Sequence, residues 1–145
     1  MRAVVQRVKK AAVSVDGKVI SSIDSGLLVL LGIEKDDTEE TALYVSNKIA
    51  NLRIFEDEFG KMNLSVQDIN GSILVVSQFT LASQIKKGNR PSFSDAMEED
   101  KAKVLYEKFV SDLEKLGVPV RTGVFKAHME VTLTNDGPVT FIIER

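Results

Sequence analysis

Apolar residues along the chain fall into short runs that predict β-strands. Most of these runs are rich in Val, Ile and Leu, and one alternates apolar with polar side chains, as a half-buried strand does. The predicted strands cover residues 1–8, 11–15, 18–23, 27–33, 73–81, 129–134 and 139–143. Asp16-Gly17 separates the second and third runs and predicts a tight hairpin, because such a turn needs positive φ at both positions. We expect residues 129–134 and 139–143 to pair across a turn at residues 135–138.

Two longer segments have apolar positions with helical spacing. The first begins with Asp37 and Glu40, which are spaced as a helix start. The second begins with Asp95 and Glu98 and ends at Gly117, a residue typical of the position after a helix. The apolar face of the first predicted helix is Ala42, Val45, Ile49 and Leu52. The apolar face of the second is Ala102, Leu105, Phe109, Leu113 and Leu116.

The balance of elements indicates the fold class. About seven strands and two long helices, with hairpin connections dominant, predict an α+β fold. We expect an antiparallel, barrel-like β-sheet core with the two helices packed on the outside. The sequence shows no internal repeat, low-complexity stretch or linker, and its 145 residues suit one domain. We therefore predict a single domain over residues 1–145.

Composition and charge narrow the possible functions. Hydrophobic residues make up 43% of the chain and charged residues 28%, which fits a folded domain with one core. No apolar run reaches the ~18 residues of a membrane span, and the first residues lack the layout of a signal peptide, so we expect a cytoplasmic protein with no membrane partner. Proteins that grip long nucleic acids are usually basic. With a net charge of −2, any contact with RNA must be local.

Chemistry that needs thiols or paired histidines is absent from the sequence. There is no cysteine, which excludes a cysteine nucleophile, a disulfide and a thiolate zinc site. His128 is the single histidine, and we assign it a structural or solvent-facing role. Glu56, Asp57 and Glu58 are consecutive, a pattern more typical of a solvated charged turn than of a metal site. We predict no metal and no cofactor.

The end of the strand at residues 73–81 carries candidate chemistry. Hydroxyls and backbone N–H groups at such an end can bind a developing oxyanion. The alternative is a strand that emerges into solvent, where Ser and Thr are common, and the pattern alone favours this alternative. The polar and aromatic residues concerned are Ser77, Gln78, Phe79 and Thr80.

Two further motifs are ambiguous on their pattern alone. Gly137-Pro138 permits a cis peptide bond, yet an ordinary hairpin turn is the commoner use of such a pair. Lys86, Lys87 and Arg90 place three positive charges in a loop with Gly and Pro. Such a loop can hold phosphates, but the pattern alone favours a solvated charged loop.

Taken together, these segments resemble the D-aminoacyl-tRNA deacylase family nearly from end to end. One signature is Ser-Gln-Phe-Thr-Leu at residues 77–81, followed by Asn-Arg-Pro-Ser-Phe at residues 89–93. The second leads from Thr-Gly-Val-Phe at residues 122–125 to Asn-Asp-Gly-Pro-Val-Thr at residues 135–140. Gln-Arg-Val at residues 6–8 and Gly-Lys-Met-Asn at residues 60–63 also match. Two separate signatures in the right order are highly specific.

The resemblance implies a homodimeric hydrolase that removes D-amino acids from the acceptor end of tRNA. It implies that Gly137 and Pro138, joined by a cis bond, enter the active site of the partner subunit, face residues 77–81 and reject L-amino acids. The candidate catalytic residues are then Ser77, Gln78, Phe79 and Thr80. Candidate supporting residues are Arg7, Met129 and Asn135, and candidate contacts to tRNA are Lys86, Lys87 and Arg90.

The route of ester cleavage stays open between two versions. Thr80 could be a nucleophile, but no residue nearby in sequence supplies the base that an alcohol needs. In the version we prefer, backbone N–H groups around Phe79 and Thr80 polarise the ester and the ribose 2′-hydroxyl assists water. Selection by shape cannot reject an amino acid without a side chain, so we also expect activity on glycyl-tRNA. The competing functions are a non-catalytic dimeric RNA-binding module and a general esterase that uses Thr80.

Overall fold

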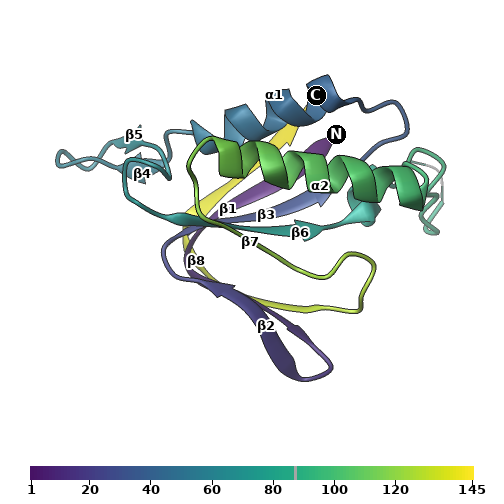
Figure 1. Cartoon of the computed structure of the whole chain (residues 1–145), viewed down its shortest axis with the longest axis horizontal. Helices are drawn as coiled ribbons and strands as arrows, with labels where there is room; N and C mark the ends of the chain where they lie inside the picture. The colour runs from purple at the N-terminus through teal and green to yellow at the C-terminus, as the bar shows by residue number, and fades with distance from the viewer. Residues whose placement is uncertain (87) are drawn as a thin grey trace.

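Two long helices lie side by side across one face of a strongly curved sheet (Figure 1). The computed structural model describes residues 1–86 and 88–145. The elements along the chain are β1 (Arg2–Val15), β2 (Lys18–Ile23), β3 (Gly26–Gly32), α1 (Glu39–Ala50), β4 (Phe55–Glu56), β5 (Met62–Leu64), β6 (Ser72–Ser77), the 3₁₀ turn η1 (Phe79–Ala82), α2 (Glu99–Lys115), β7 (Val120–Thr122) and β8 (Glu130–Glu144).

The main sheet has the strand order β2-β1-β3-β6-β7, and β8 pairs with β1. β1 is antiparallel to β2, β3 and β8. β6 is parallel to both β3 and β7, because α1 and α2 provide the long crossovers that parallel neighbours need. The predicted α+β fold, with a barrel-like sheet and two outer helices, is confirmed. The parallel pairs at β6 add to the antiparallel core that the sequence predicted.

β1 is one continuous strand where the sequence predicted two runs. Its first part, as far as Val8, pairs with β3, and its last part, from Ala11, pairs with β2. The strand thus passes from one side of the curved sheet to the other without a break. The hairpin that follows is confirmed, since Asp16 and Gly17 have φ angles of 50° and 75°.

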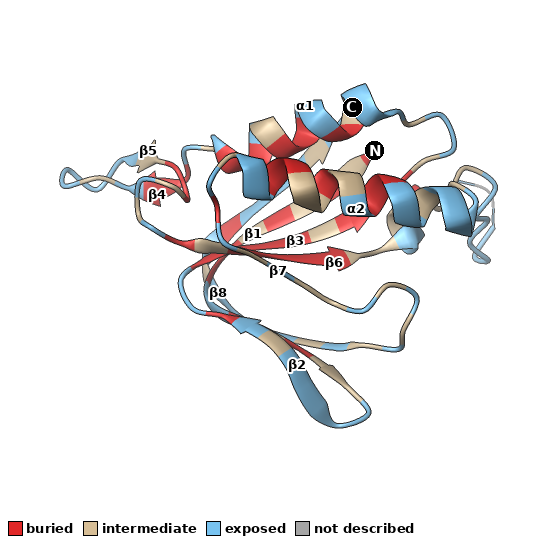
Figure 2. Ribbon diagram, in the orientation of Figure 1, coloured by how far each residue is buried: buried red, intermediate tan, exposed pale blue. Residues whose placement is uncertain are grey.

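The main core lies between the sheet and the helices (Figure 2). The apolar faces predicted for both helices point into it, and Ile49 of α1 and Phe109 of α2 are fully buried. Alternate strand residues face opposite ways, so a second and smaller cluster forms on the other face of the sheet. This cluster consists of Val8, Ala11, Val13, Ile23, Leu28, Leu74 and Val76. No helix among the described residues is long and apolar enough to cross a membrane.

Both helices begin later than predicted. Thr38 is the N-cap of α1, and it exchanges hydrogen bonds with Thr41 in a capping box. The carboxylate of Asp37 instead pairs with the N-terminal ammonium of Met1 and accepts a hydrogen bond from the N–H of Glu34 (2.6 Å). α2 begins after Glu98, which makes no capping bond with its side chain. Asp95, predicted to open α2, instead accepts hydrogen bonds from the side chains of Lys35 (3.1 Å) and Gln84 (2.7 Å).

The predicted hairpin at residues 135–138 is wrong. β8 continues through this segment and runs alongside β1. Gln6 is opposite Thr140 and Val8 is opposite Asn135, which leaves residues 136–139 opposite Arg7 alone. These four residues therefore project from the ladder as a bulge, named here the 136–139 bulge.

Candidate active site

A pocket of about 480 Å³ opens where β3 and β6 end. The carboxyl ends of neighbouring parallel strands are a common place for ligand sites. One wall is formed by the ends of these strands and the start of η1. The opposite wall is the loop between β7 and β8. The first wall includes Leu31, Val76, Ser77, Gln78 and Phe79, and the second includes Phe125, Ala127 and Met129.

The chain turns from β6 into η1 at the edge of this pocket. The N–H of Gln78 still donates to the carbonyl oxygen of Leu31 (2.8 Å), and η1 begins at the next residue. The side-chain Nε2 of Gln78 lies 2.6 Å from the hydroxyl of Thr80. The first N–H groups of a helical turn have no acceptor within the turn. Among the described residues, none accepts a hydrogen bond from the N–H of Phe79 or of Thr80. The turn thus offers two unpaired backbone donors.

The opposite wall is supported from α2. The ring of Tyr106 packs against Phe125 with their centroids 5.6 Å apart, and its hydroxyl donates to the carbonyl oxygen of Val75 (2.8 Å). Burial raises the pKa of Tyr106 well above its ordinary value, so the hydroxyl remains a donor. Gly123 leaves space for Met129, because a Cβ there would lie 2.6 Å from the methionine sulfur. These contacts fix Met129 in the wall.

Charged side chains meet at the rim of the pocket. Lys126 has a φ of 68°, and its ammonium lies 2.7 Å from the carboxylate of Glu99. The hydrogen bond and charge of Glu99 raise the pKa of Lys126. His128 also lines the pocket and is exposed. None of the three makes a hydrogen bond with Thr80 among the described contacts.

A separate cluster of hydrogen bonds holds the 136–139 bulge. Arg7, only 7% exposed, donates from Nε to the carbonyl oxygen of Asp136 (2.9 Å) and from Nη1 to that of Ile54 (2.7 Å). The side-chain amide of Asn135 donates to the carbonyl oxygens of Arg7 (2.9 Å) and Val139 (3.2 Å). Side chains therefore hold the bulge where the strand ladder is interrupted.

Gly137 and Pro138 lie at the tip of the bulge. They are exposed, and the peptide bond between them is cis. A Cβ at Gly137 would collide with the side-chain oxygen of Asn135 and the backbone nitrogen of Val139, so a side chain there would displace the bulge. Neither Gly137 nor Pro138 lines the pocket of its own chain.

The predicted basic residues lie on the loop between η1 and α2. Lys86 and Arg90 are exposed there, in a hairpin closed by Gln84 and Ser92. Lys87 lies outside the residues that the structure describes. The predicted residues thus fall into three groups. The first is the pocket, lined by Ser77, Gln78, Phe79 and Met129, with Thr80 adjoining it. The second is the 136–139 bulge with its supports Arg7 and Asn135, and the third is this basic loop.

Comparison with known proteins identifies the family. The model of the D-Tyr-tRNA(Tyr) deacylase family matches residues 4–144. The chain belongs to this deacylase family. D-aminoacyl-tRNA deacylases from Aquifex aeolicus and Geobacter metallireducens are 60% and 56% identical to it over 144 residues, which is 99% of this chain and 97% and 95% of theirs. Membership makes the chain an enzyme, a hydrolase that acts on carboxylic ester bonds.

Two solved structures are similar to the deacylase chain. The first, described as c-Myc DNA Unwinding Element Binding Protein, has a TM-score of 0.96 at 47% identity and covers 100% of this chain and 99% of that one. The second, described as a probable eukaryotic D-amino acid tRNA deacylase, has a TM-score of 0.85 at 18% identity and covers 98% and 97%. The second similarity supports the fold alone.

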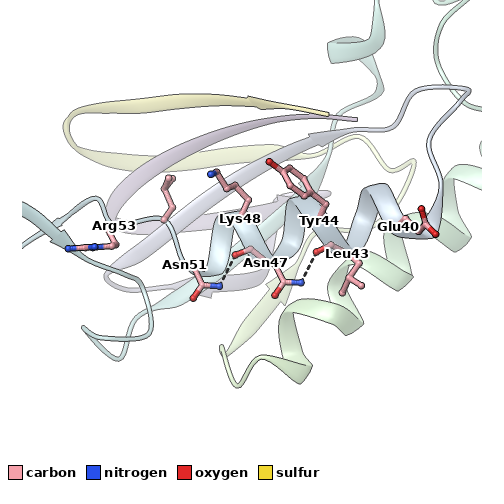
Figure 3. A pocket seen from close by; sticks show the side chains of 8 residues that line it. Glu40, Leu43, Tyr44, Asn47, Lys48, Asn51 and Arg53 are labelled. Atoms are coloured by element: carbon pink, nitrogen blue, oxygen red, sulfur yellow. Dashed lines mark hydrogen bonds between the residues drawn. The ribbon is translucent and has the colours of Figure 1, made fainter.

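A larger hollow, of about 680 Å³, lies on the outer face of α1 (Figure 3). Leu43, Tyr44 and Lys48 are among its lining residues. The side chains of Asn47 and Asn51 donate to backbone carbonyls of the preceding turn (2.8 Å each) and are thereby occupied. Neither signature of the deacylase family reaches this hollow. We therefore place the candidate active site in the smaller pocket.

Sequence reasoning missed the side of the pocket that lies near α2. Ala96, Met97 and Ala102 line it, but apolar residues around a helix start carry no signal that distinguishes a pocket from core. Phe125 belonged to the second signature, which was the one available indication of its position. Lys126 and Glu99 are 27 positions apart in the numbering, and only folding brings them together.

Proposed function

We propose that the chain hydrolyses the ester between a D-amino acid and the terminal ribose of tRNA. The observation that carries this proposal is the pair of unpaired N–H donors, of Phe79 and Thr80, at the edge of the pocket. The substrate class follows from the relatives, which are named D-aminoacyl-tRNA deacylases. Water adds to the ester carbonyl carbon and the two N–H groups bind the negative oxygen. The bond to the ribose oxygen then breaks, and that oxygen takes up a proton.

Backbone donors, and no side-chain nucleophile, carry this reaction. Among the described contacts the Thr80 hydroxyl meets only the side-chain amide of Gln78, and an amide is not a general base. The ribose 2′-hydroxyl of the substrate assists the attacking water. Thr80→Ala keeps the backbone N–H and should retain substantial activity in single-turnover hydrolysis of D-tyrosyl-tRNA. A fall to the spontaneous rate would favour Thr80 as nucleophile and the esterase alternative.

Chiral selection requires a homodimer in which the partner's Gly137 and the partner's Pro138 enter the pocket. β8 supports this arrangement because β1 is its one partner among the described strands, while Phe141 and Ile142 on it are exposed. A long strand with an unpaired edge and exposed apolar side chains favours association. The bulge projects from the same strand, and Arg7 and Asn135 hold its backbone in place. A loop fixed in this way crowds the direction of an L side chain and leaves the D direction open.

The acceptor end of tRNA reaches the site along the loop of Lys86, Lys87 and Arg90. Lys86 and Arg90 are exposed on this loop, and the net charge of −2 makes such a local group the place for phosphate contacts. Replacing Lys86 and Arg90 by Glu should weaken tRNA binding and lower the salt slope by about 1–2. The matched control replaces Lys18, exposed at the start of β2, and Lys61, exposed between β4 and β5. Unchanged affinity for tRNA in the Lys86 and Arg90 variant would show that the loop does not bind it.

The unit that performs this reaction is a single domain over residues 1–145, acting in the cytoplasm. One core cluster supports the single domain, since it contains Met1 and Val139 together with residues of both helices. Removing residues 130–144 should therefore unfold the chain as a whole, as followed by circular dichroism, and a folded remainder would contradict the single domain.

One assay separates the candidate functions. D-tyrosyl-, L-tyrosyl- and glycyl-tRNA are incubated side by side with the purified protein, and release of amino acid is followed. A chiral deacylase releases D-tyrosine and glycine and spares L-tyrosine. A general esterase cleaves all three esters, and a non-catalytic module binds tRNA without accelerating any of them. Decay of glycyl-tRNA at its spontaneous rate would contradict selection by shape alone.

A further inference from the structure

Two phenylalanine rings are exposed in contact with each other at the edge of the pocket. Phe79 is 61% exposed and Phe93 is 42% exposed. Their ring centroids are 5.0 Å apart and their planes are inclined at 52°. Large apolar side chains are usually buried, and exposed apolar side chains that lie in contact with one another can mark a binding site.

Hydrogen bonds hold the backbone on both sides of Phe93. Gln84 and Ser92 close the loop with two hydrogen bonds (2.8 and 2.9 Å), and Phe93 follows directly. The carbonyl oxygen of Phe93 accepts the N–H of Ala96 (3.0 Å), and Asp95 is held by the side chain of Gln84 (2.7 Å). These contacts fix the position of Phe93 before a ligand binds, which lowers the cost of binding.

The loop that leads to Phe93 carries positive and no negative side chains. Lys86 and Arg90 lie on the hairpin that carries Phe93, and residues 84–94 contain no acidic side chain. Asp95 is the first carboxylate after them, and Lys35 pairs with it at 3.1 Å. Aromatic rings next to basic side chains form the usual surface for single-stranded nucleic acid, because every base can stack and every nucleotide carries a phosphate.

We propose that Phe79 and Phe93 form a stacking surface for the unpaired nucleotide that immediately precedes the esterified adenosine of tRNA. The inference rests on the proposed function and deepens it. Phe79 lines the pocket and Phe93 does not, so the ring of Phe93 contacts the chain one step outside the ester-bearing nucleotide. Lys86 and Arg90 neutralise the phosphates of that step. Phe93 is thus a positioning residue that holds the single-stranded end in register with the pocket.

The test compares two substrates that differ in this nucleotide. D-tyrosyl-tRNA contains it, and D-tyrosyl-adenosine, the ester on adenosine alone, lacks it. Phe93→Leu should raise KM for D-tyrosyl-tRNA by about 5- to 150-fold, the effect of losing one stacked base, with kcat nearly unchanged. The same variant should leave kcat/KM for D-tyrosyl-adenosine unchanged. Phe93→Trp should restore the low KM, since tryptophan also stacks.

Two controls keep the result specific. Phe59→Leu removes a phenylalanine that is 78% exposed on the β4–β5 hairpin and should change neither KM. Thermal unfolding and sedimentation of each variant report folding and association. Equal losses on both substrates, unchanged KM on tRNA, or loss of the dimer in Phe93→Leu would each overturn the inference, the last because a second protomer would then cover the rings. A wild-type protein inactive on D-tyrosyl-tRNA would overturn the proposed function itself.

Discussion

The two faces of the sheet differ in how completely their apolar side chains are buried. The helix-covered face contains the main core, with Phe109, Ile49 and Leu113 entirely buried. The open face has the smaller cluster, against which Met129 and Leu133 are only partly buried. Figure 2 shows the same contrast, with buried residues on the inner sides of α1 and α2 and exposed residues over β2.

This contrast indicates that different parts of the molecule provide stability and bind the substrate. The helix-covered face is complete within one chain and accounts for most of the apolar burial. The pocket, the 136–139 bulge and the exposed ring pair of Phe79 and Phe93 lie at the margins of this core, where strands end or the ladder is interrupted. Polar contacts there hold backbone in defined positions without burying much surface. Substitutions in the core should therefore lower stability, whereas substitutions at its margins should lower activity.

The largest effect is expected on the helix-covered face. Phe109→Ala removes a fully buried ring and should lower the free energy of unfolding by about 3–5 kcal/mol. Urea denaturation measures the change. Val104→Ala, on the same helix but at a residue 66% exposed, should stay within ~0.5 kcal/mol. Similar losses for the two variants would show that burial of Phe109 in the core does not account for its effect.

The next largest effect is expected at the bulge, and it concerns activity. Gly137→Ala places a methyl group against Asn135 and the backbone of Val139, so the bulge must move. A displacement of about 1 Å can cost ~100-fold in rate, and we expect at least that loss on D-tyrosyl-tRNA with little change in the unfolding midpoint. Thr134→Ala, exposed on the same strand, is the control. Full activity of Gly137→Ala would remove the bulge from the reaction.

A smaller effect is expected for Arg7→Lys, which tests whether the support of the bulge affects stability, activity or both. The guanidinium reaches two carbonyl oxygens, those of Asp136 and Ile54, and a lysine ammonium cannot reproduce this fork. Loss of one buried hydrogen bond should cost about 1–3 kcal/mol of stability and should also lower activity. Arg53→Lys, at an exposed arginine that donates from Nε to Asn63 (2.8 Å), should change neither. Unaltered hydrolysis by Arg7→Lys would show that the hydrogen bonds of Arg7 contribute to stability alone.

The smallest effect is a shift in titration near the ring pair. Hydrogen bonds from Gln84, then from Lys35, hold the pKa of Asp95 below its ordinary value of 3.8. A depressed pKa in the folded state stabilises the fold above the ordinary carboxyl pKa, and the contribution is lost as pH falls through the lowered pKa. Gln84→Ala should move the pKa of Asp95 upwards, as followed by NMR of the side-chain carboxyl. An unchanged pKa of Asp95 in Gln84→Ala would show that Gln84 does not hold this carboxylate.

Local pattern predicted the parts of the fold that local physics decides. The spacing of Val45 and Ile49, and of Phe109 and Leu113, identified the buried faces of both helices. Asp16-Gly17 identified a turn that needs positive φ. The parallel pairing of β3 with β6 was not predicted, because an apolar run has the same pattern in either orientation.

Contacts between segments distant in sequence decided the features that the local pattern did not predict. Asn-Asp-Gly-Pro has the composition of a hairpin turn, but its neighbours on both sides pair with β1, and this turned the expected loop into a bulge within one strand. Asp37 had the spacing of a cap, but its carboxylate pairs with the N-terminal ammonium of Met1. The candidate site followed from the family signatures, whereas the pairing of Phe79 with Phe93 needed the folded loop.

The pairing of β1 with β8 also sets an order of events during synthesis. Arg2 pairs with Glu144 and Ala11 with Leu133, so β1 finds this neighbour only after the more than 100 residues between them have been synthesised. Contacts so distant in sequence form slowly and leave strand edges unprotected in the interval. Helices α1 and α2, which are complete earlier, can shelter one face of the nascent sheet, while the unpaired edge of β1 stays open to chaperones until β8 arrives.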